Sequence, residues 1–276
     1  MNAKQDHQTF LPIKHSLALI YAGSFIIAIL MATASAVGLL YRTTIYPKEE
    51  LLRTFVSNDV VNLFIGLPIL LGSMWLTWRG KLIGLLCWSG ALFFVLNNYI
   101  AYVFASPLNW AFVLYLALVM MSIYTLIGLF ATIDEKVVQQ WLTGTVSEKF
   151  AVGVLVGFGL LFFLRVIGVI VNALTSGKLI AETELAVNIS DFFITPAWVI
   201  GGIMLWRRKE FGYMAGLGLL FQASMLFIAL IIFLLLQPFL TNTPFIMADV
   251  IVVSTMGMIC FVPFVLFVRG VVAKRV

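Results

Sequence analysis

Eight apolar stretches recur along the chain, separated by short polar segments. Each is long enough to cross a bilayer, which takes about 20 apolar residues in a helix. The stretches cover residues 16–41, 59–78, 81–104, 110–131, 150–172, 187–206, 211–237 and 245–268. The sixth has the least distinct start, because it begins in the polar sequence Asn188-Ile189-Ser190-Asp191. The pattern predicts an all-α, polytopic membrane protein with eight transmembrane helices, forming a single transmembrane domain over residues 1–276.

Composition supports this assignment and narrows the possible functions. Of the 276 residues, 62% are hydrophobic and 11% are charged, whereas about 25% of a soluble domain is charged. Eight membrane-spanning helices leave no room for a separate aqueous catalytic domain. Any activity must therefore take place in or at the bilayer.

The basic residues predict the orientation of the helices. If the N-terminus is cytoplasmic, four basic residues fall in outside segments: Arg42, Lys48, Arg53 and Lys178. Twelve fall in inside segments: Lys4, Lys14, Arg79, Lys81, Lys136, Lys149, Arg207, Arg208, Lys209, Arg269, Lys274 and Arg275. This bias follows the positive-inside rule. It predicts a cell-membrane protein with both termini cytoplasmic, and the scattered charges give no reason to expect nucleic-acid binding.

The first stretch also has features of a cleavable signal peptide. Lys14 precedes an apolar run, and the small-residue sequence 32–36 follows it. However, the apolar run continues to Leu40 and reaches about 26 residues, which is too long for the core of a signal peptide. We therefore expect a retained helix.

A weak internal repeat relates the two halves of the chain, 16–131 and 150–268. A shift of 128 residues aligns Pro68 with Pro196, Trp78 with Trp206, Arg79 with Arg207, Lys81 with Lys209 and Gly84 with Gly212. A shift of 132 aligns Glu50 with Glu182 and Asp59 with Asp191. Halves with an even number of helices share one orientation, so the pattern suggests two parallel four-helix repeats. The alternative is that short loops at a membrane boundary favour Trp, Arg and Lys in any case.

Several kinds of chemistry lack their residues. Cys87 and Cys260 lie in apolar stretches, and His7 and His15 precede the first span or lie at its edge. No disulfide framework, metal site, haem or other cofactor is therefore expected. The sequence 49–53 resembles the paired-glutamate signature of CAAX-type intramembrane proteases, but it is expected in a loop and lacks the downstream histidines. No catalytic residue is assigned, and enzyme activity is not expected.

Polar groups inside the spans are the candidates for function, because each costs free energy in hydrocarbon unless it is paired or hydrated. Helical rise places them at similar depths near the outer side. The candidate solute-binding residues are Arg165, Asp191, Asp249, Asp59, Asn98, Tyr102, Tyr115 and Asn172. We expect an outward-facing polar cavity with Arg165 as its central cation. One of the aspartates would be its counter-ion or a proton-linked carboxylate.

A structural interpretation of the same residues stays open. Asp59 and Asp191 could cap the outer ends of two helices, while the Arg165 side chain extends towards the membrane surface. Asp249 fits this interpretation less well, because Thr243-Pro244 already supplies the start of the last helix.

Two segments carry a family resemblance. Residues 95–130 (VLNNYIAYVFASPLNWAFVLYLALVMMSIYTLIGLF) and 190–213 (SDFFITPAWVIGGIMLWRRKEFGY) resemble bacterial and archaeal multi-helix membrane proteins. The features that recur in that group map to Asn98, Tyr99, Tyr102, Asn109, Tyr115, Arg165 and Asp191. The resemblance covers about half of the chain and implies no particular activity.

Binding or transport of a small solute or ion is the function we expect, with the lipid bilayer and that solute as partners. The alternative is a ligand-sensing or structural subunit whose polar cluster is a dry helix-packing network. A membrane-embedded enzyme is a third possibility, since paired carboxylates can do acid–base chemistry. The sequence does not indicate an oligomeric state.

Overall fold

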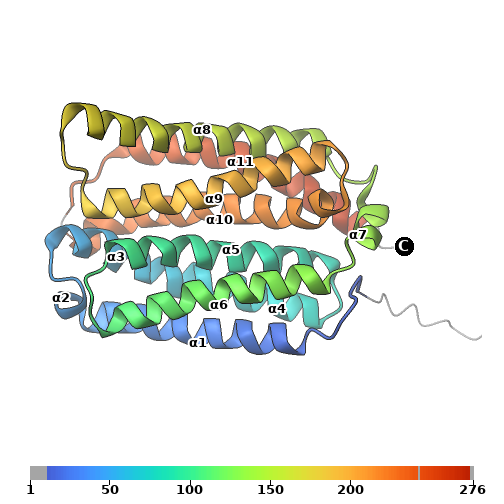
Figure 1. Ribbon diagram of the computed structural model, residues 1–276, viewed down its shortest axis with the longest axis horizontal. Helices are drawn as coiled ribbons and strands as arrows, with labels where there is room; N and C mark the ends of the chain where they lie inside the picture. Colours follow the sequence, from blue (N-terminus) through green and yellow to red (C-terminus); the bar gives the residue numbers. More distant parts are fainter. Residues whose placement is uncertain (1–10, 242, 274–276) are drawn as a thin grey trace, which may run out of the picture.

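The computed structural model describes residues 11–241 and 243–273, and nearly all of them lie in helices (Figure 1). The helices are α1 (Ala18–Leu40), α2 (Arg42–Ile45), α3 (Glu49–Val61), η1 (Asn62–Gly66), α4 (Leu67–Trp78), α5 (Leu82–Ala105), α6 (Trp110–Thr132), α7 (Glu135–Leu142), α8 (Glu148–Ser176), α9 (Glu182–Trp206), α10 (Glu210–Thr241) and α11 (Met247–Ala273). In the described chain, eight helical segments are long and apolar enough to span a membrane; α3, η1 and α4 form one of them. The prediction of an all-α protein with eight spans is confirmed.

The second and sixth spans start well before the predicted residues, whereas the other spans start within two residues of them. Helix α3 begins at Glu49, ten residues early, so the prediction that Glu49 and Glu50 lie in a loop is wrong. Helix α9 begins at Glu182 rather than at 187. These polar first turns are stabilised by contacts that hydropathy does not report, since Arg53 pairs with Glu49 and Glu50 accepts hydrogen bonds from Thr183.

The spans pack as two four-helix bundles that lie side by side (Figure 1). In the first bundle, each helix packs on the next to close a ring of α1, the segment α3–η1–α4, α5 and α6. In the second bundle, a ring of the same kind is formed by α8, α9, α10 and α11. Helices α5 and α10 form the centre of the contact between the bundles, with α9 packed on α5 and α3 packed on α10.

Helices α5 and α10 touch backbone to backbone at Gly90 and Gly218. A Cβ atom on Gly90 would lie 2.1 Å from the Gly218 carbonyl oxygen, and one on Gly218 would lie 2.2 Å from Ser89 Oγ. Small residues permit such close approach of membrane helices. Because Gly90 lies in the third turn of α5, the contact is near the end at which both helices start.

The turns that lead into α5 and α10 are alike, hydrogen bond by hydrogen bond. In the turn before α5, the amides of Arg79, Gly80 and Lys81 donate to the carbonyls four, three and five residues earlier, respectively. In the turn before α10, the amides of Arg207, Arg208 and Lys209 make the same three hydrogen bonds. Both turns need one residue with positive φ: Gly80 at 70° and Arg208 at 53°. Arg208 adopts this conformation although it is not glycine, which is uncommon.

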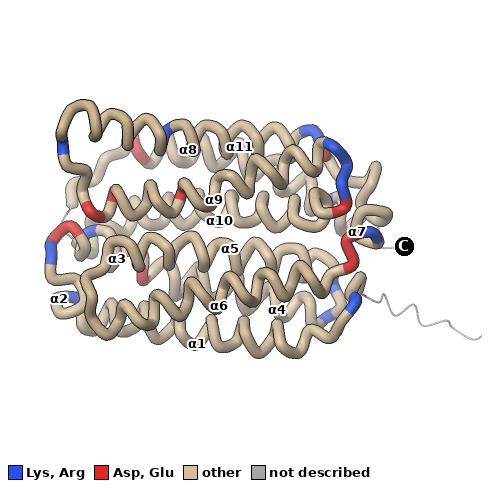
Figure 2. Tube along the Cα trace, in the orientation of Figure 1, with Lys and Arg blue, Asp and Glu red and all other residues tan. Residues whose placement is uncertain are grey.

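Basic residues gather at the end of the molecule where these turns lie (Figure 2). Arg79, Lys81 and the run Arg207-Arg208-Lys209 are found there. The opposite end carries α2, the start of α3 and the start of α9, with Glu residues as well as Lys48.

Substituting Gly90 with Ala should destabilise the protein, because the new methyl group would overlap the backbone of α10. Overpacking of this kind costs about 1–3 kcal/mol. Thermal unfolding in detergent should therefore show a clearly lower midpoint for Gly90→Ala. The control is Gly153→Ala in α8, where a Cβ atom would have open space within 4 Å. Equal midpoints for the two variants would contradict the close crossing.

Candidate functional site

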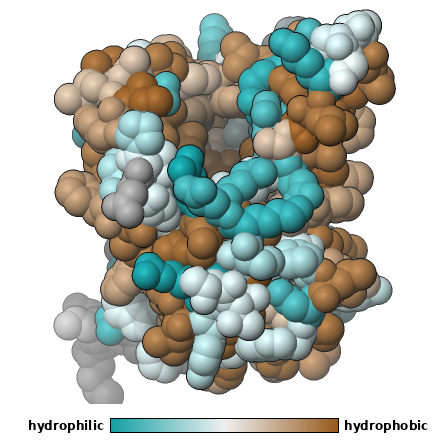
Figure 3. Space-filling model, turned by 90° about the vertical axis from the view of Figure 1, so that its left-hand side faces the viewer, coloured by the Kyte–Doolittle hydropathy of each residue, from teal (hydrophilic) through white to brown (hydrophobic). Residues whose placement is uncertain are grey.

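A cavity of about 560 Å³ lies where the two bundles meet. Its walls come from α3, α5, α8, α9 and α10. It extends from the first turn of α9, at Thr183 and Glu184, inward to Thr195 and Trp198. Figure 3 shows a hollow at this end of the molecule, bordered by hydrophilic residues. The apolar wall is formed by Phe55, Ala101, Phe162, Val187, Ile194, Leu226, Phe227, Ala229, Leu230 and Phe233.

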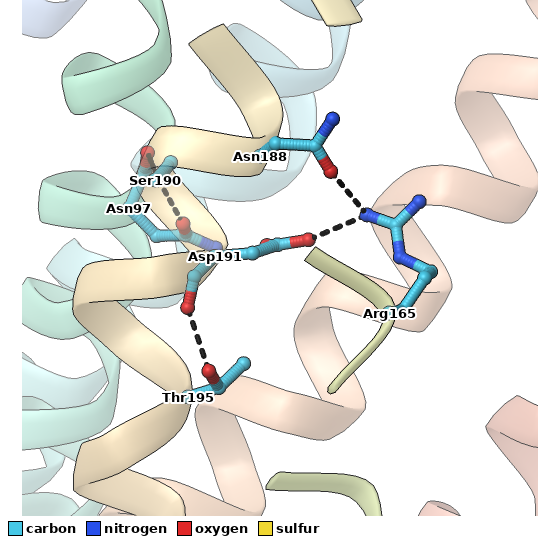
Figure 4. A network of polar contacts seen from close by, with 6 residues as sticks. All are labelled: Asn97, Arg165, Asn188, Ser190, Asp191 and Thr195. Carbon is cyan, nitrogen blue, oxygen red and sulfur yellow. Dashed lines mark hydrogen bonds and ion pairs between the residues drawn. The ribbon is translucent and has the colours of Figure 1, made fainter. Parts of the chain in front are cut away.

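An ion pair joins Arg165 of α8 to Asp191 of α9 in the wall of this cavity (Figure 4). Arg165 Nη2 lies 3.0 Å from Asp191 Oδ2 and also donates to Asn188 Oδ1 at 3.2 Å. The Arg165 side chain is 45% exposed and that of Asp191 is 22% exposed. The pair is therefore open on the arginine side and shielded on the carboxylate side.

The same wall holds N–H groups without acceptors. Asn188 is buried, and its Nδ2 has no hydrogen-bond partner among residues 11–241 and 243–273. Within those residues Arg165 uses only Nη2, which leaves the other guanidinium N–H groups unpaired. Buried polar groups in native proteins nearly always have partners. The exposed N–H groups of Arg165 can therefore bind a water molecule or an oxygen of a ligand, whereas Asn188 Nδ2 is enclosed by the protein.

The ion pair is held in place by contacts of α9. Ser190 Oγ donates to the backbone carbonyl of Asn97 at 2.6 Å and to its side-chain oxygen, which ties α9 to α5. Thr195 Oγ1 donates to the Asp191 carbonyl at 2.7 Å (Figure 4). Pro196, the next residue, has no N–H for the helical ladder. The hydrogen bonds of Ser190 to α5 thus fix which side of α9 faces the cavity.

A second polar cluster, which we call the tyrosine cage, surrounds Asp59 in the first bundle. Tyr46 Oη donates to Asp59 Oδ2 at 2.7 Å, and Tyr102 Oη donates to Asp59 Oδ1 at 2.9 Å. Tyr115 Oη lies 3.3 Å from Tyr46 Oη. The cage consists of Tyr46, Tyr99, Tyr102 and Tyr115, all fully buried. Burial raises the pKa of Tyr46 well above its ordinary value, so this phenol remains a hydrogen-bond donor.

Asn58 connects the cage to the cavity. Its Nδ2 lies 3.3 Å from Tyr102 Oη and 3.3 Å from Asn98 Oδ1. Asn58 and Asn98 both line the cavity, whereas Tyr102 and Asp59 are behind it. The Asn58 amide therefore bridges the buried cluster and the cavity, beside Phe55, whose ring lies against Tyr102.

The structure groups six of the eight candidate residues and separates two. Asn98, Arg165 and Asp191 line the cavity, while Asp59, Tyr102 and Tyr115 belong to the cluster behind it. Asn172 and Asp249 are exposed and do not line it.

The capping interpretation does not fit Asp59 and Asp191. Asp59 is the eleventh residue of α3 and Asp191 is the tenth residue of α9, so neither caps a helix. The expectation that Asp249 lies well past the start of its helix is also wrong, because α11 begins at Met247 and Asp249 is in its first turn. A carboxylate there complements the helix dipole.

Two important residues were not among the sequence candidates. Asn188 lies in the polar sequence at the expected start of a span, where it looked like part of a helix end. Tyr46 lies between α2 and α3, where hydropathy gives no signal. Only the packing of α1, α3, α5 and α6 brings Tyr46 to Asp59.

Comparison with models of protein families, with characterised proteins and with solved structures found no match.

The ion pair should show coupling in a double-mutant cycle of Arg165→Gln and Asp191→Asn. Each single variant leaves one charge unpaired, and the double variant removes both. For contacting residues we expect a coupling of about 1 kcal/mol, in the lower part of the usual range, because Arg165 is nearly half exposed. Thermal unfolding in lipid nanodiscs measures it. Strictly additive effects would contradict the pair.

Proposed function

We propose that this protein binds a small polar solute in the cavity between its two bundles and carries it across the membrane. The observation that supports this most is the Arg165–Asp191 pair beside the unpaired Nδ2 of Asn188, all in the wall of a cavity of about 560 Å³. Ionisable groups inside membrane spans usually mark pathways or binding sites.

The chemistry of the wall favours a solute that carries both charges. The free N–H groups of Arg165 can bind a carboxylate, and the carboxylate of Asp191 can accept from an ammonium group. A purely anionic solute would add a charge that the neutral Arg165–Asp191 pair does not compensate. The apolar wall formed by Phe162, Leu226 and Phe227 would contact the rest of the molecule.

We further propose that the chain consists of two parallel four-helix repeats, 16–131 and 150–268. The equivalent turns at Arg79–Lys81 and Arg207–Lys209 support this, as does the ring order of helices in each bundle. Gly90 and Gly218 are also 128 residues apart, so the closest contact would join equivalent positions. Transporters of this kind bind their substrate between the repeats.

The orientation we propose follows from the charges. The end rich in Arg and Lys, which holds Arg79 and Arg207, would face the cytoplasm. The cavity would then open to the outside, through Thr183 and Glu184 at the start of α9.

Tracer uptake into proteoliposomes tests this proposal. The probes are three sets of small molecules: zwitterionic amino acids, monocarboxylates and monoamines. We expect saturable uptake from the zwitterionic set and a loss of at least about tenfold in Arg165→Gln, since a charged hydrogen bond contributes about 1.5–3 kcal/mol. Lys178→Gln, which changes a cation outside the cavity, should leave uptake unchanged.

Two results would count against transport. Absence of saturable uptake and of saturable binding for all three sets would contradict it. Equal uptake by the wild type and Arg165→Gln would show that the cavity is not the pathway.

A further inference from the structure

The carboxylate of Asp59 is enclosed in the membrane-spanning part of the protein without a cation. The residue is 1% exposed, and within residues 11–241 and 243–273 no basic nitrogen lies within 4 Å of its oxygens. The groups that face it are phenols from the segment before α3, from α5 and from α6, together with Ser35 and Gly38 of α1. An ionised carboxylate in such a place is costly, and groups of this kind bind a proton instead.

Helix α1 packs so closely against Asp59 that a side chain larger than that of glycine would not fit at Gly38. A Cβ atom on Gly38 of α1 would lie 2.0 Å from Asp59 Oδ2 and 2.6 Å from Tyr46 Oη. Directly after α3, the π-helical turn η1 places Asn62 Nδ2 3.4 Å from Tyr102 Oη. The space around the carboxyl group is thus filled by hydroxyl and amide groups.

The hydroxyl groups can satisfy both protonation states. When Asp59 is ionised, Tyr46 and Tyr102 donate to its two oxygens. When it is protonated, its O–H can donate to Tyr46, and the Tyr46 hydroxyl can rotate to donate to Tyr115 at 3.3 Å. Rotation of one hydroxyl therefore keeps each of these oxygens hydrogen-bonded.

Asp191 offers an internal comparison. A shift of 132 residues aligns it with Asp59, and the two are the tenth and the eleventh residue of their own helices, α9 and α3. Asp191 has Arg165 at 3.0 Å and lines the cavity, whereas Asp59 has phenols and lies behind Asn58. One carboxylate is paired with a cation, and the other has only neutral donors.

We propose that Asp59 and the tyrosine cage form a reversible proton-binding site, which is occupied by a proton at neutral pH and exchanges it with the cavity. For exchange, the Asn58 amide moves away from Tyr102 and a water molecule takes its place. For this step the proton is carried on Asp59 Oδ1 and the Tyr102 hydroxyl turns from Oδ1 to the water. The Asp59 proton then passes to the Tyr102 oxygen as the Tyr102 hydroxyl proton passes to the water, which leaves an ionised Asp59, a neutral Tyr102 and a hydronium ion in the cavity. The site would couple proton binding to the solute cavity, and this coupling alone rests on the proposed function.

Infrared spectroscopy of the full-length protein in lipid nanodiscs tests the site without any solute. At neutral pH we expect the C=O stretching band of a protonated carboxyl group, sensitive to exchange into D₂O. The band should be lost in Asp59→Asn and retained in the matched variant Asp191→Asn. Tyr102→Phe should keep the band at a shifted frequency, because one hydrogen bond to the carboxyl group is lost.

Each outcome decides for or against the proton site. A wild type without the band, or an unchanged band in Asp59→Asn, would overturn it. If Asp59→Asn does not fold, an unshifted band in Tyr102→Phe would overturn it equally. If no solute is taken up but the infrared spectra are as expected, the proposed transport is contradicted and the proton site is still supported.

Discussion

The backbone contact between Gly90 and Gly218 determines how the two bundles sit against each other. Neither position accepts a Cβ atom, so α5 and α10 can come this close at these glycines. The contact lies near the end where both helices begin, beside the two equivalent turns. Further along, Asn98 of α5 and Leu226 of α10 line the cavity. The helices are thus closed together at one end, and the cavity lies towards the other.

The surroundings of each charged group near this cavity reflect the free-energy cost of burying a charge. Arg165 remains partly exposed to the cavity and is neutralised by Asp191. Asp59 is fully enclosed, and Tyr46 and Tyr102 donate to it. Asn58 and Asn98 connect the surroundings of Asp59 to the cavity, which both of them line. Asp191 and Asp59, which a shift of 132 residues aligns, therefore have different surroundings. Asp191 is paired with a cation, and Asp59 accepts hydrogen bonds from neutral phenols.

Hydropathy was sufficient to predict the eight spans, because apolar length is a local property of the chain. It failed at Glu49 and Glu182, where contacts between bundles stabilise polar first turns. The intramembrane charge Arg165 and its partner Asp191 were recognisable from the cost of such groups. The role of Tyr46 was not, since a tyrosine in a loop becomes a cage residue only through the packing of distant helices. Asn172 was selected because helical spacing places it on one face with Arg165, and Asp249 was selected by its depth. Neither property tells whether a side chain reaches the cavity, and neither residue lines it.

A cavity that binds a polar solute must be open to water, and two alanines of α5 test this directly. Ala101 lines the cavity, whereas Ala91 is fully buried and does not. Each is replaced singly by cysteine in a Cys87→Ala, Cys260→Ala background, and a membrane-impermeant thiol reagent is added to folded protein in intact vesicles from the side on which the cavity opens. We expect rapid labelling of Ala101→Cys and protection of Ala91→Cys. Protection of both would contradict a hydrated cavity and favour a dry network of packed helices.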